Sequence, residues 1–287
     1  MTKSVPAHEQ RDPREAFPHL VPIGSDLPLG EYLGQMWLRR DFLFAMPRNS
    51  LRAQNQDTLL GSLWHLLNPL LLAGVFYVVF GVIFDARTGV DNYVAFLIIG
   101  VFVFTFTSKA AMAGTRSIVG RARLVQQLSF PRAILPGGEA LAETWAHAYA
   151  IGAMLAVAIL TGVNPALTWL GLPLVLALQA LFNLGITMIT ARLTFHFRDT
   201  AQFLPYLTRI AMYLSGVFFP VGYVPAGWAR DLFQLNPIFT TIEIHRALVI
   251  GTELKSWWWL NTSGWALLLL VVGFLFFRAR ETEYGRI

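Results

Sequence analysis

Five ionisable side chains interrupt stretches of this sequence that are otherwise apolar, and they carry most of its capacity for chemistry. Glu139, Glu143 and His147 are spaced at i, i+4 and i+8, which places them on one face of a helix. Lys109 and Arg209 lie in two other apolar stretches. A charge inside a membrane is costly, so such groups pair with one another or face water. We therefore expect an intramembrane pair between Glu143 and either Arg209 or Lys109, which would stabilise the fold or take part in conduction.

Motifs of known catalytic chemistry are absent from the sequence. The chain has three lysines, none of which follows a glycine, so it contains no GxxxxGK[ST] loop to bind a nucleotide. It also lacks HExxH, GxSxG and paired-aspartate motifs, and it has no cysteine to ligate a metal or form a disulfide. We therefore expect neither an enzyme active site nor a metal site, and no cofactor bound by this chain itself.

Hydropathy indicates which elements must position these residues. Of 287 residues, 55% are hydrophobic and 14% are charged, whereas soluble domains carry about a quarter charged residues. The sequence predicts an all-α membrane protein with six transmembrane helices, each long enough for a hydrocarbon core of about 30 Å. The six predicted spans are residues 61–84, 93–115, 135–161, 168–191, 202–221 and 257–277.

The distribution of lysine and arginine predicts how these spans are oriented. With both termini in the cytosol, 16 of the 22 basic residues lie on the cytosolic side, four lie in external loops and two lie within spans. Because cytosolic loops of membrane proteins are enriched in lysine and arginine, this asymmetry favours that orientation. The same asymmetry accounts for the formal net charge of +5, because the excess basic residues lie in cytosolic loops. The charge therefore does not indicate nucleic-acid binding, and we expect no nucleic-acid partner.

Three further segments are predicted to lie outside the spans. Residues 1–30 are polar and proline-rich, and we expect a flexible cytosolic tail. Residues 31–45 are amphipathic and should lie along the cytosolic interface as a helix; a linker that ends at residue 59 joins it to a transmembrane domain of residues 60–287. Residues 225–251 hold two apolar pieces around Asn236-Pro237, each too short to cross, which predicts an external re-entrant pair of half-helices between spans five and six.

A basic segment between the second and third spans has a pattern of its own. Its apolar stripe consists of Leu124, Val125 and Leu128. Arg121 and Arg123 lie largely off this stripe, and Pro131 ends the helix because the residue before a proline is pushed out of the α region. The pattern predicts a short cytosolic helix with an apolar stripe; the positive-inside rule alone would place these arginines there but does not explain the stripe or the helix end.

Four short motifs follow one another along the chain from residue 31 onward. They are LG-x-LW with a following Asn-Pro (60–69), FPRAILP (130–136), HFRD (196–199), and FFPVGYVP with LNP (218–225 and 235–237). Their composition and order resemble those of ABC-2-type polysaccharide export permeases, the Wzm-like transmembrane subunits of O-antigen, teichoic acid and actinobacterial galactan exporters. The linker at residues 48–61 departs from that family, whose members carry a more basic, tyrosine-containing run there.

The resemblance implies the exporter fold of this family and a homodimer that works with two copies of a separate ATPase subunit, which bind ATP and magnesium. It implies a polyprenyl-diphosphate-linked glycan as cargo and the inner membrane of a bacterium as location. The short cytosolic helix would then be the coupling helix, with ATPase contacts at Arg121, Leu124, Gln126 and Phe130. An ABC-2 exporter of drugs or lipids, and a membrane-embedded enzyme or scaffold of glycan assembly, are the alternatives.

Two sets of residues are candidate contacts for such a cargo. Aromatic faces would let a sugar chain slide, and the candidate channel aromatics are Phe76, Tyr77, Phe80, Phe104, Tyr206 and Tyr213. The same side chains could instead face lipid or pack helices together. Arginine forks suit phosphate, so a basic set could bind the diphosphate or, alternatively, anionic lipid headgroups. It consists of Arg39, Arg40, Arg48 and Arg52.

Overall fold

The computed structural model describes residues 28–44, 61–83, 90–127 and 130–286, which form helices joined by turns, without a strand. The all-α class predicted from the sequence is confirmed for this part of the chain. Nearly all of the predicted tail and most of the linker, including Arg48 and Arg52, lie outside the described residues.

Five helical segments are long and apolar enough to cross a membrane. They are α4 with the π-helical turn η2 (Trp64–Phe76 and Tyr77–Ile83), α5 (Tyr93–Ser117), α7 (Ile134–Leu160), η4 with α8 (Leu167–Gly171 and Leu172–His196), and α12 (Ser256–Arg278). Their bounds agree to within a few residues with five of the six spans predicted from the sequence.

The fifth predicted span is interrupted. Helix α9 covers only Thr200–Tyr213, and at 1.5 Å per residue it is about 21 Å long, less than a hydrocarbon core of about 30 Å. Gly216 prevents the helix from continuing, because its φ of 63° is in the left-handed region. A Cβ at Gly216 would also lie 2.9 Å from the ring of Phe239. The prediction of one continuous helix over residues 202–221 is therefore wrong, and residues 214–220 continue as irregular backbone.

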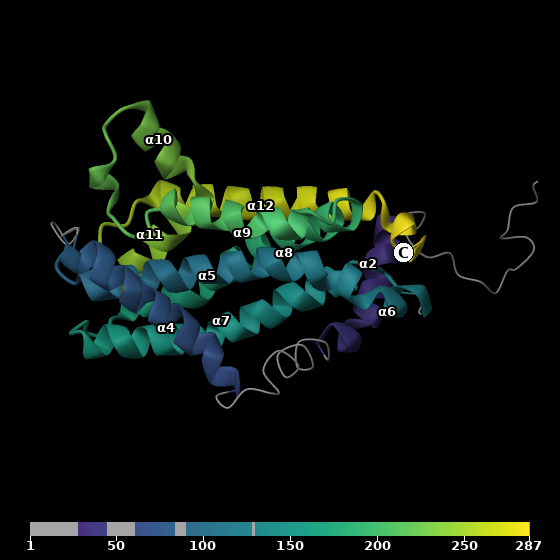
Figure 1. Ribbon diagram of the computed structural model, residues 1–287, viewed down its shortest axis with the longest axis horizontal. Helices are drawn as coiled ribbons and strands as arrows, with labels where there is room; N and C mark the ends of the chain where they lie inside the picture. The colour runs from purple at the N-terminus through teal and green to yellow at the C-terminus, as the bar shows by residue number, and fades with distance from the viewer. Residues whose placement is uncertain (1–27, 45–60, 84–89, 128–129, 287) are drawn as a thin grey trace, which may run out of the picture.

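The segment after this irregular backbone forms the two helices predicted around Asn236-Pro237. They are α10 (Trp228–Leu235) and α11 (Pro237–Ile250). The Asn236 side chain caps α11 by accepting from the amide of Ile238, and its amide group donates to the carbonyl of Leu214. Ten residues of α11 are buried, whereas α10 has none and projects from the bundle (Figure 1). Helix α11 is packed inside the protein, and α10 contacts it through Phe233, whose ring lies 5.1 Å from that of Phe239.

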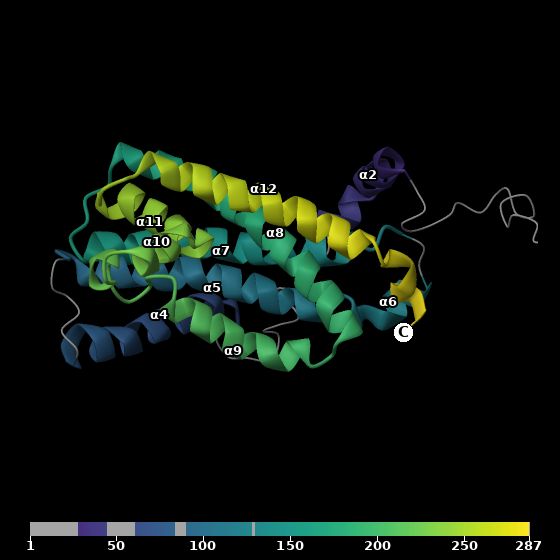
Figure 2. The same ribbon diagram turned by 90° about the horizontal axis from the view of Figure 1, so that it is seen from above.

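The helices form an elongated bundle around α5, most of which is buried (Figures 1 and 2). One end, here called the proximal end, carries the short elements α2 (Leu29–Leu38), η3 (Val119–Arg121), α6 (Ala122–Gln127) and η6 (Glu281–Arg286). The opposite, distal end carries α10 and α11. Both α2 and the end of the chain therefore lie at the proximal end.

Helices α8 and α12 cross closely through two glycines. A Cβ on Gly185 would lie 2.2 Å from the carbonyl oxygen of Leu269, and one on Gly273 would lie 2.5 Å from the carbonyl oxygen of Gly185. Small residues allow the backbones of membrane helices to approach this closely, and their packing replaces the hydrophobic driving force that lipid does not supply.

We expect Gly273→Ala to lower the thermal unfolding midpoint of the purified protein in detergent, because the added methyl group overpacks a backbone contact at a cost of about 1–3 kcal/mol. Gly264→Ala is the matched control on the same helix, since nothing lies within 4 Å of a Cβ there. Equal midpoints for the two variants would contradict this account of the α8–α12 crossing.

Candidate functional site

The short helix α6 at the proximal end is held against the bundle by both charge and apolar contacts. The Arg121 guanidinium donates to the carboxylate of Glu139 on α7. Val125 is 2% exposed, and Phe130 is 4% exposed with its ring 5.7 Å from that of Phe42. Phe130, one of the four residues predicted to contact an ATPase, therefore supports the loop from inside, and the prediction that its side chain is a surface contact is corrected. Leu124 is half-buried beside the same apolar cluster.

The outward surface of α6 is polar. Gln126 and Arg123 are exposed, and they lie on the side of the helix away from Val125. Of the four predicted coupling residues, Gln126 is thus the one whose side chain is on the surface. Arg123 was assigned to the polar side of the helix but not to the contact set, and its exposure adds it to the candidates.

A cluster here called the proximal junction joins the FPRAILP motif to both ends of the described chain. The backbone N–H of Arg132 donates to Oε1 of Glu281 at 2.6 Å, and its guanidinium donates to the Glu281 carbonyl. The hydroxyl of Tyr32, on α2, accepts from the amide of Ala133 at 3.4 Å. The guanidinium of Arg278 lies 5.2 Å from the centre of the Tyr32 ring. The proximal junction consists of Tyr32, Arg132, Arg278 and Glu281.

The electrostatics of the proximal junction depend on burial. Burial raises the pKa of the Glu281 carboxyl, while the amide of Arg132 and the hydroxyl of Tyr32 act in the opposite direction by hydrogen-bonding to the carboxylate. Burial also lowers the pKa of the Arg132 guanidinium, and the charge of Glu281 opposes that shift. Each buried group thus relies on its partners in the junction, so removing one leaves another unsatisfied.

The HFRD motif is attached to the same element. Nε2 of His196 lies 3.1 Å from Oε2 of Glu283, and the ring of Phe195 packs edge-on against Tyr284 at 4.8 Å. The Tyr284 hydroxyl in turn donates to the carbonyl of Phe277. Element η6 therefore binds the loop before α7, the end of α8 and helix α2 at once.

The charged residues predicted at membrane depth are separated by the fold. Glu139, Glu143 and His147 are all buried on α7, as their spacing predicts. Lys109 and Arg116 are the basic groups whose charges act on Glu143. Arg209 is not among them, because it lies on the exposed side of α9 and borders a different cavity. Of the two predicted partners, Lys109 lines the same cavity as Glu143 and Arg209 does not. The described residues form no ion pair between Glu143 and either of them, so the intramembrane pair stays a prediction.

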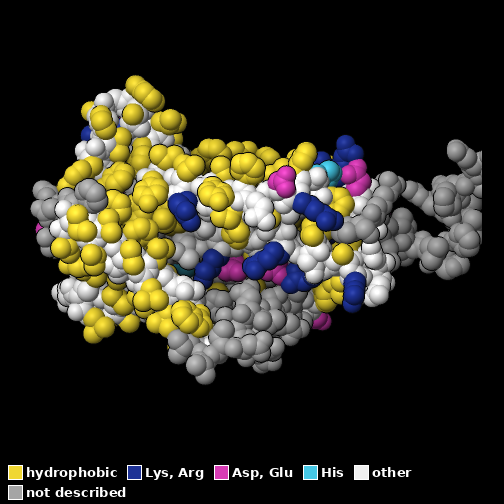
Figure 3. All heavy atoms as spheres, viewed as in Figure 1, with side chains coloured by type: hydrophobic (Ala, Val, Ile, Leu, Met, Phe, Trp, Pro, Cys, Tyr) yellow, Lys and Arg dark blue, Asp and Glu magenta, His cyan; other side chains and the backbone are white. Residues whose placement is uncertain are grey.

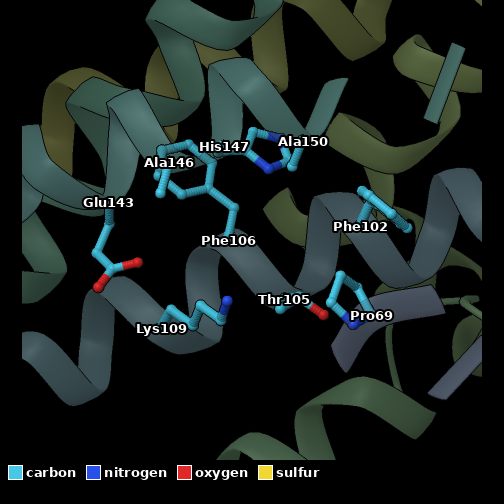
Figure 4. A pocket seen from close by; sticks show the side chains of 9 residues that line it. All are labelled: Pro69, Phe102, Thr105, Phe106, Lys109, Glu143, Ala146, His147 and Ala150. Atoms are coloured by element: carbon cyan, nitrogen blue, oxygen red, sulfur yellow. The ribbon is translucent and has the colours of Figure 1, made fainter. Parts of the chain in front are cut away.

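The space beside Lys109 and Glu143 is small (Figure 4). A cavity of about 20 Å³ lies between α4, α5 and α7, lined by Lys109, Glu143 and His147 among others. The His147 ring stacks on Phe106 with centroids 4.4 Å apart. A cavity of this size holds about one water molecule. No solute as large as a sugar could pass here, so any path for one must use another surface.

A larger cavity, here called the lateral groove, lies over α5 between α4 and α9, which flank it in Figure 1. Its volume is about 340 Å³, and its lining includes Phe104 and Arg209. Tyr206 and Tyr213 are 65% and 46% exposed on the adjoining face of α9. The Arg209 guanidinium has no hydrogen bond or ion pair with any residue that the structure describes. The groove thus places one predicted charge and three predicted aromatics along one side of the molecule.

The other predicted aromatics pack against one another near the distal end. The rings of Phe76 and Phe80 lie 4.4 and 4.7 Å from that of Phe218, which is fully buried, and Tyr213 lies 5.2 Å from the same ring. Tyr77 contacts Tyr93 at 6.4 Å. Within one copy of the chain, Phe76, Tyr77 and Phe80 therefore join α4 to its neighbours.

Arg246 is the most extensively hydrogen-bonded buried charge among the described residues, and it lies beside the irregular backbone. It is 0% exposed. Its guanidinium donates to the carbonyls of Phe96, Gly216 and Val217, and it pairs with Glu243 at 2.7 Å. The guanidinium carbon also lies 3.3 Å from the centre of the Phe96 ring. The sequence counted Arg246 only as an external basic residue, and the structure makes it the support of residues 216–217.

Two of the predicted basic residues lie at the proximal end on the surface. Arg39 and Arg40 are exposed next to α2, and the Arg40 guanidinium lies 5.0 Å from the centre of the Trp37 ring. Both could meet an anionic group at a membrane surface. Arg48 and Arg52 lie outside the described residues.

Comparison with known proteins agrees with this arrangement. The family model for the ABC-2 type transporter matches residues 42–250. The chain belongs to the ABC-2 transporter family. The match covers the lateral groove, α6, the FPRAILP and HFRD motifs, and α10 with α11.

Three proteins with sequences similar to this ABC-2 chain are named as export proteins for O-antigen or capsule polysaccharide. The O-antigen export system permease protein RfbA of Klebsiella pneumoniae is 25% identical over 248 residues, which cover 86% of this chain and 95% of that protein. The RfbA protein of Myxococcus xanthus is 25% identical over 75% of this chain and 82% of its own. The capsule polysaccharide export inner-membrane protein CtrC of Neisseria meningitidis is 24% identical over 73% of this chain and 80% of its own.

Sequence reasoning missed Glu281 and Tyr32 of the ABC-2 chain as functional residues. Glu281 contacts Arg132 across 149 positions, and no periodicity connects residues so far apart. One signal was present: FPRAILP is an apolar motif with a single arginine, and a partly buried arginine requires an acceptor elsewhere in the chain.

We expect Glu281→Ala to destabilise the proximal junction by about 1–3 kcal/mol, because it removes the acceptor of a buried backbone N–H. Glu281→Gln keeps an oxygen acceptor and should lose less. The thermal unfolding midpoint in detergent measures both, and Thr282→Ala, at an exposed neighbour, is the control. If Glu281→Ala and Thr282→Ala melt alike, the junction does not stabilise the protein.

Proposed function

We propose that this chain is the transmembrane subunit of an ABC transporter that exports a polysaccharide linked to polyprenyl diphosphate. The family match and the names of the three relatives support the class of transporter and of cargo. The observation in the structure that carries the proposal is the lateral groove with the exposed Arg209 beside it.

The proximal end is the cytosolic end in this proposal. In Figure 3, charged side chains gather on the proximal half of the molecule, whereas apolar side chains cover most of the distal half. This agrees with the positive-inside distribution of lysine and arginine. Since α2 and the chain end share the proximal end, the chain must cross an even number of times (Figure 1). Helix α9 and residues 214–220 together supply the sixth crossing.

The export path lies between two copies of the chain that face each other across their lateral grooves. A single copy would leave Arg209 and the exposed tyrosines of α9 toward lipid, and a charge at the membrane centre costs about 2.5–3.5 kcal/mol by insertion measurements. A second copy covers this face and allows Arg209 to line a water-filled path. Tyr206, Tyr213 and Phe104 then present aromatic surface along it, with room for sugar units.

ATP is hydrolysed by two copies of a separate subunit that bind ATP and magnesium. The exposed Arg123 and Gln126 of α6 are the contacts for that subunit. Displacement of α6 is transmitted to α7 through the Arg121–Glu139 pair. It is transmitted to α2 and α12 through the proximal junction, and to α8 through the contact of His196 with Glu283 on η6. ATP shifts the equilibrium only through its higher affinity for the closed ATPase dimer.

The lipid-linked cargo enters from the side at the proximal end. Arg39 and Arg40 are exposed there, and arginine forks suit the two phosphates of a diphosphate. Arg48 and Arg52 complete the basic set in the sequence. In this arrangement the diphosphate meets the protein at the interface, while the glycan enters the path between the two lateral grooves.

A single cysteine at Ile210 should form a disulfide-linked dimer under oxidation in native membranes, because the natural chain has no cysteine and Ile210 is 57% exposed on α9. Leu267→Cys is the matched control, since Leu267 is 63% exposed on α12, away from the groove. Dimers are detected on non-reducing gels. If Leu267→Cys forms a disulfide-linked dimer and Ile210→Cys does not, the interface between the two copies lies elsewhere.

Arg123→Glu should reduce co-purification of the ATPase subunit by tenfold or more and lower the amount of polysaccharide on the cell surface, because it reverses the charge at the contact surface of α6. Arg198→Glu makes the same change at another exposed arginine of the proximal end. Depletion of the chain should make lipid-linked glycan accumulate in the cytosolic leaflet. Normal surface polysaccharide without the chain would refute export of a glycan.

A further inference from the structure

Two opposite charges line the small cavity between α4, α5 and α7 without forming an ion pair. The carboxylate belongs to Glu143 on α7 and the ammonium to Lys109 on α5 (Figure 4). Neither group makes a hydrogen bond or an ion pair with any residue that the structure describes. Glu143 is only 4% exposed, so bulk water does not take the place of a partner.

A buried carboxylate without a partner is unfavourable inside a transmembrane bundle, where charges either pair or contact water. The charge of Lys109 acts more strongly on Glu143 than any other charge does. Glu139, one turn away on α7, is bound directly to Arg121 instead. Glu143 therefore has a cation within electrostatic range but no donor in contact, which points to a small molecule between the two groups.

The size and the polar lining of the cavity select that molecule. Its volume is about 20 Å³, and about 10–15 Å³ is enough to hold one water molecule. A bound water also needs about two to four polar partners. Glu143 supplies acceptors, Lys109 supplies donors, and the hydroxyl-bearing side chain of Thr105 lines the same space. A phosphate group or a sugar is too large for it.

The rest of the wall does not favour any other small ligand. The stacked rings of Phe106 and His147 form one side of it, with Phe102 and Pro69 nearby. The ammonium of Lys109 repels a metal cation, and no group of three His, Cys, Asp or Glu side chains in the described part of the chain is placed to hold one. Purely apolar cavities of proteins stay dry, so the two charges are what would hold a water here.

We propose that one ordered water molecule binds in this cavity and bridges the Glu143 carboxylate to the Lys109 ammonium. The water donates to an oxygen of Glu143 and accepts from Nζ of Lys109. Helix α7 is then held at two successive turns: directly where Glu139 meets Arg121 of η3, and through water where Glu143 faces α5. The intramembrane pair predicted from the sequence is thus water-mediated. This water would bind whatever cargo the protein exports.

X-ray hydroxyl-radical footprinting of the full-length protein in nanodiscs tests for this water, because irradiation converts a bound water into a radical that oxidises the side chains beside it. Phe106 lines the cavity and should be oxidised although it is only 2% exposed. Phe218 is fully buried and does not line the cavity, so it is the control in the same sample. We expect Phe106 to be oxidised at least tenfold faster than Phe218.

Variants of similar size separate the effect of the polar groups from that of the space. Glu143→Gln keeps an oxygen acceptor and should retain the oxidation of Phe106. Glu143→Leu removes every polar atom, and Lys109→Met removes the donor, so each should lower the oxidation tenfold or more. Ala146→Val fills the cavity and should lower it as much. Ala148→Val is the matched control, because Ala148 is exposed on the same helix and does not line the cavity.

Oxidation of Phe106 that is no faster than that of Phe218 in the natural protein would overturn the inference, and this comparison needs no variant to fold. It would mean that the two charges pair directly or that the cavity is dry. Equal oxidation of Phe106 in Glu143→Leu and in the natural protein would also overturn it, because the water would then not depend on the charges. Export is not the readout, so either result leaves the proposed function intact.

Discussion

The buried guanidinium of Arg246 is the interaction on which the distal half of this structure depends. Residues 214–220 are irregular backbone, so their carbonyls lack the partners that a continuous helix would supply, and a buried carbonyl left unsatisfied would cost about 1–3 kcal/mol. Arg246 donates to two of these carbonyls and to one on α5. Glu243 balances its charge, and burial without this partner would be strongly unfavourable. One arginine thus permits a break in a helix and a short α9.

The proximal half follows a different principle, in which one short element contacts several others. Element η6 binds the loop before α7 through Glu281, the end of α8 through Glu283, and the aromatic cluster through Tyr284. Helix α2 joins the same cluster through Tyr32. Movement of α6 therefore cannot be confined to its own loop. These contacts join α2, the loop before α7, the end of α8 and η6 to one another.

Much of the fold could be predicted from the sequence because lipid makes hydrophobicity a reliable signal. Five spans and the division at Asn236-Pro237 follow from length, apolar composition and proline chemistry. The fifth span could not be predicted, because its hydropathy is continuous while Gly216 and the remote Arg246 end its helix. The partner of Glu143 could not be chosen from the sequence either, because the depth of a residue in the membrane says nothing about which side of a helix faces which neighbour.

In the candidate site, too, features that depend on local helical spacing could be predicted, whereas contacts between segments distant in the sequence could not. Spacing identified the buried face of α7 and the polar side of α6 correctly, since both depend on helical periodicity alone. Spacing could not show that Phe130 points inward, or that Arg246 reaches the carbonyls of Gly216 and Val217. Those arrangements depend on which helix ends come together, and a single sequence carries little information on that.

The contact between Arg132 and Glu281 also constrains the order in which the protein can be built. The two residues are separated by 149 positions and by three of the five long apolar segments. The loop before α7 reaches its final partner only after α12 has entered the membrane. Until then the Arg132 amide and guanidinium lack the acceptors that η6 provides. A membrane-inserted chain that has not yet delivered α12 would therefore leave the FPRAILP loop without its contacts to η6.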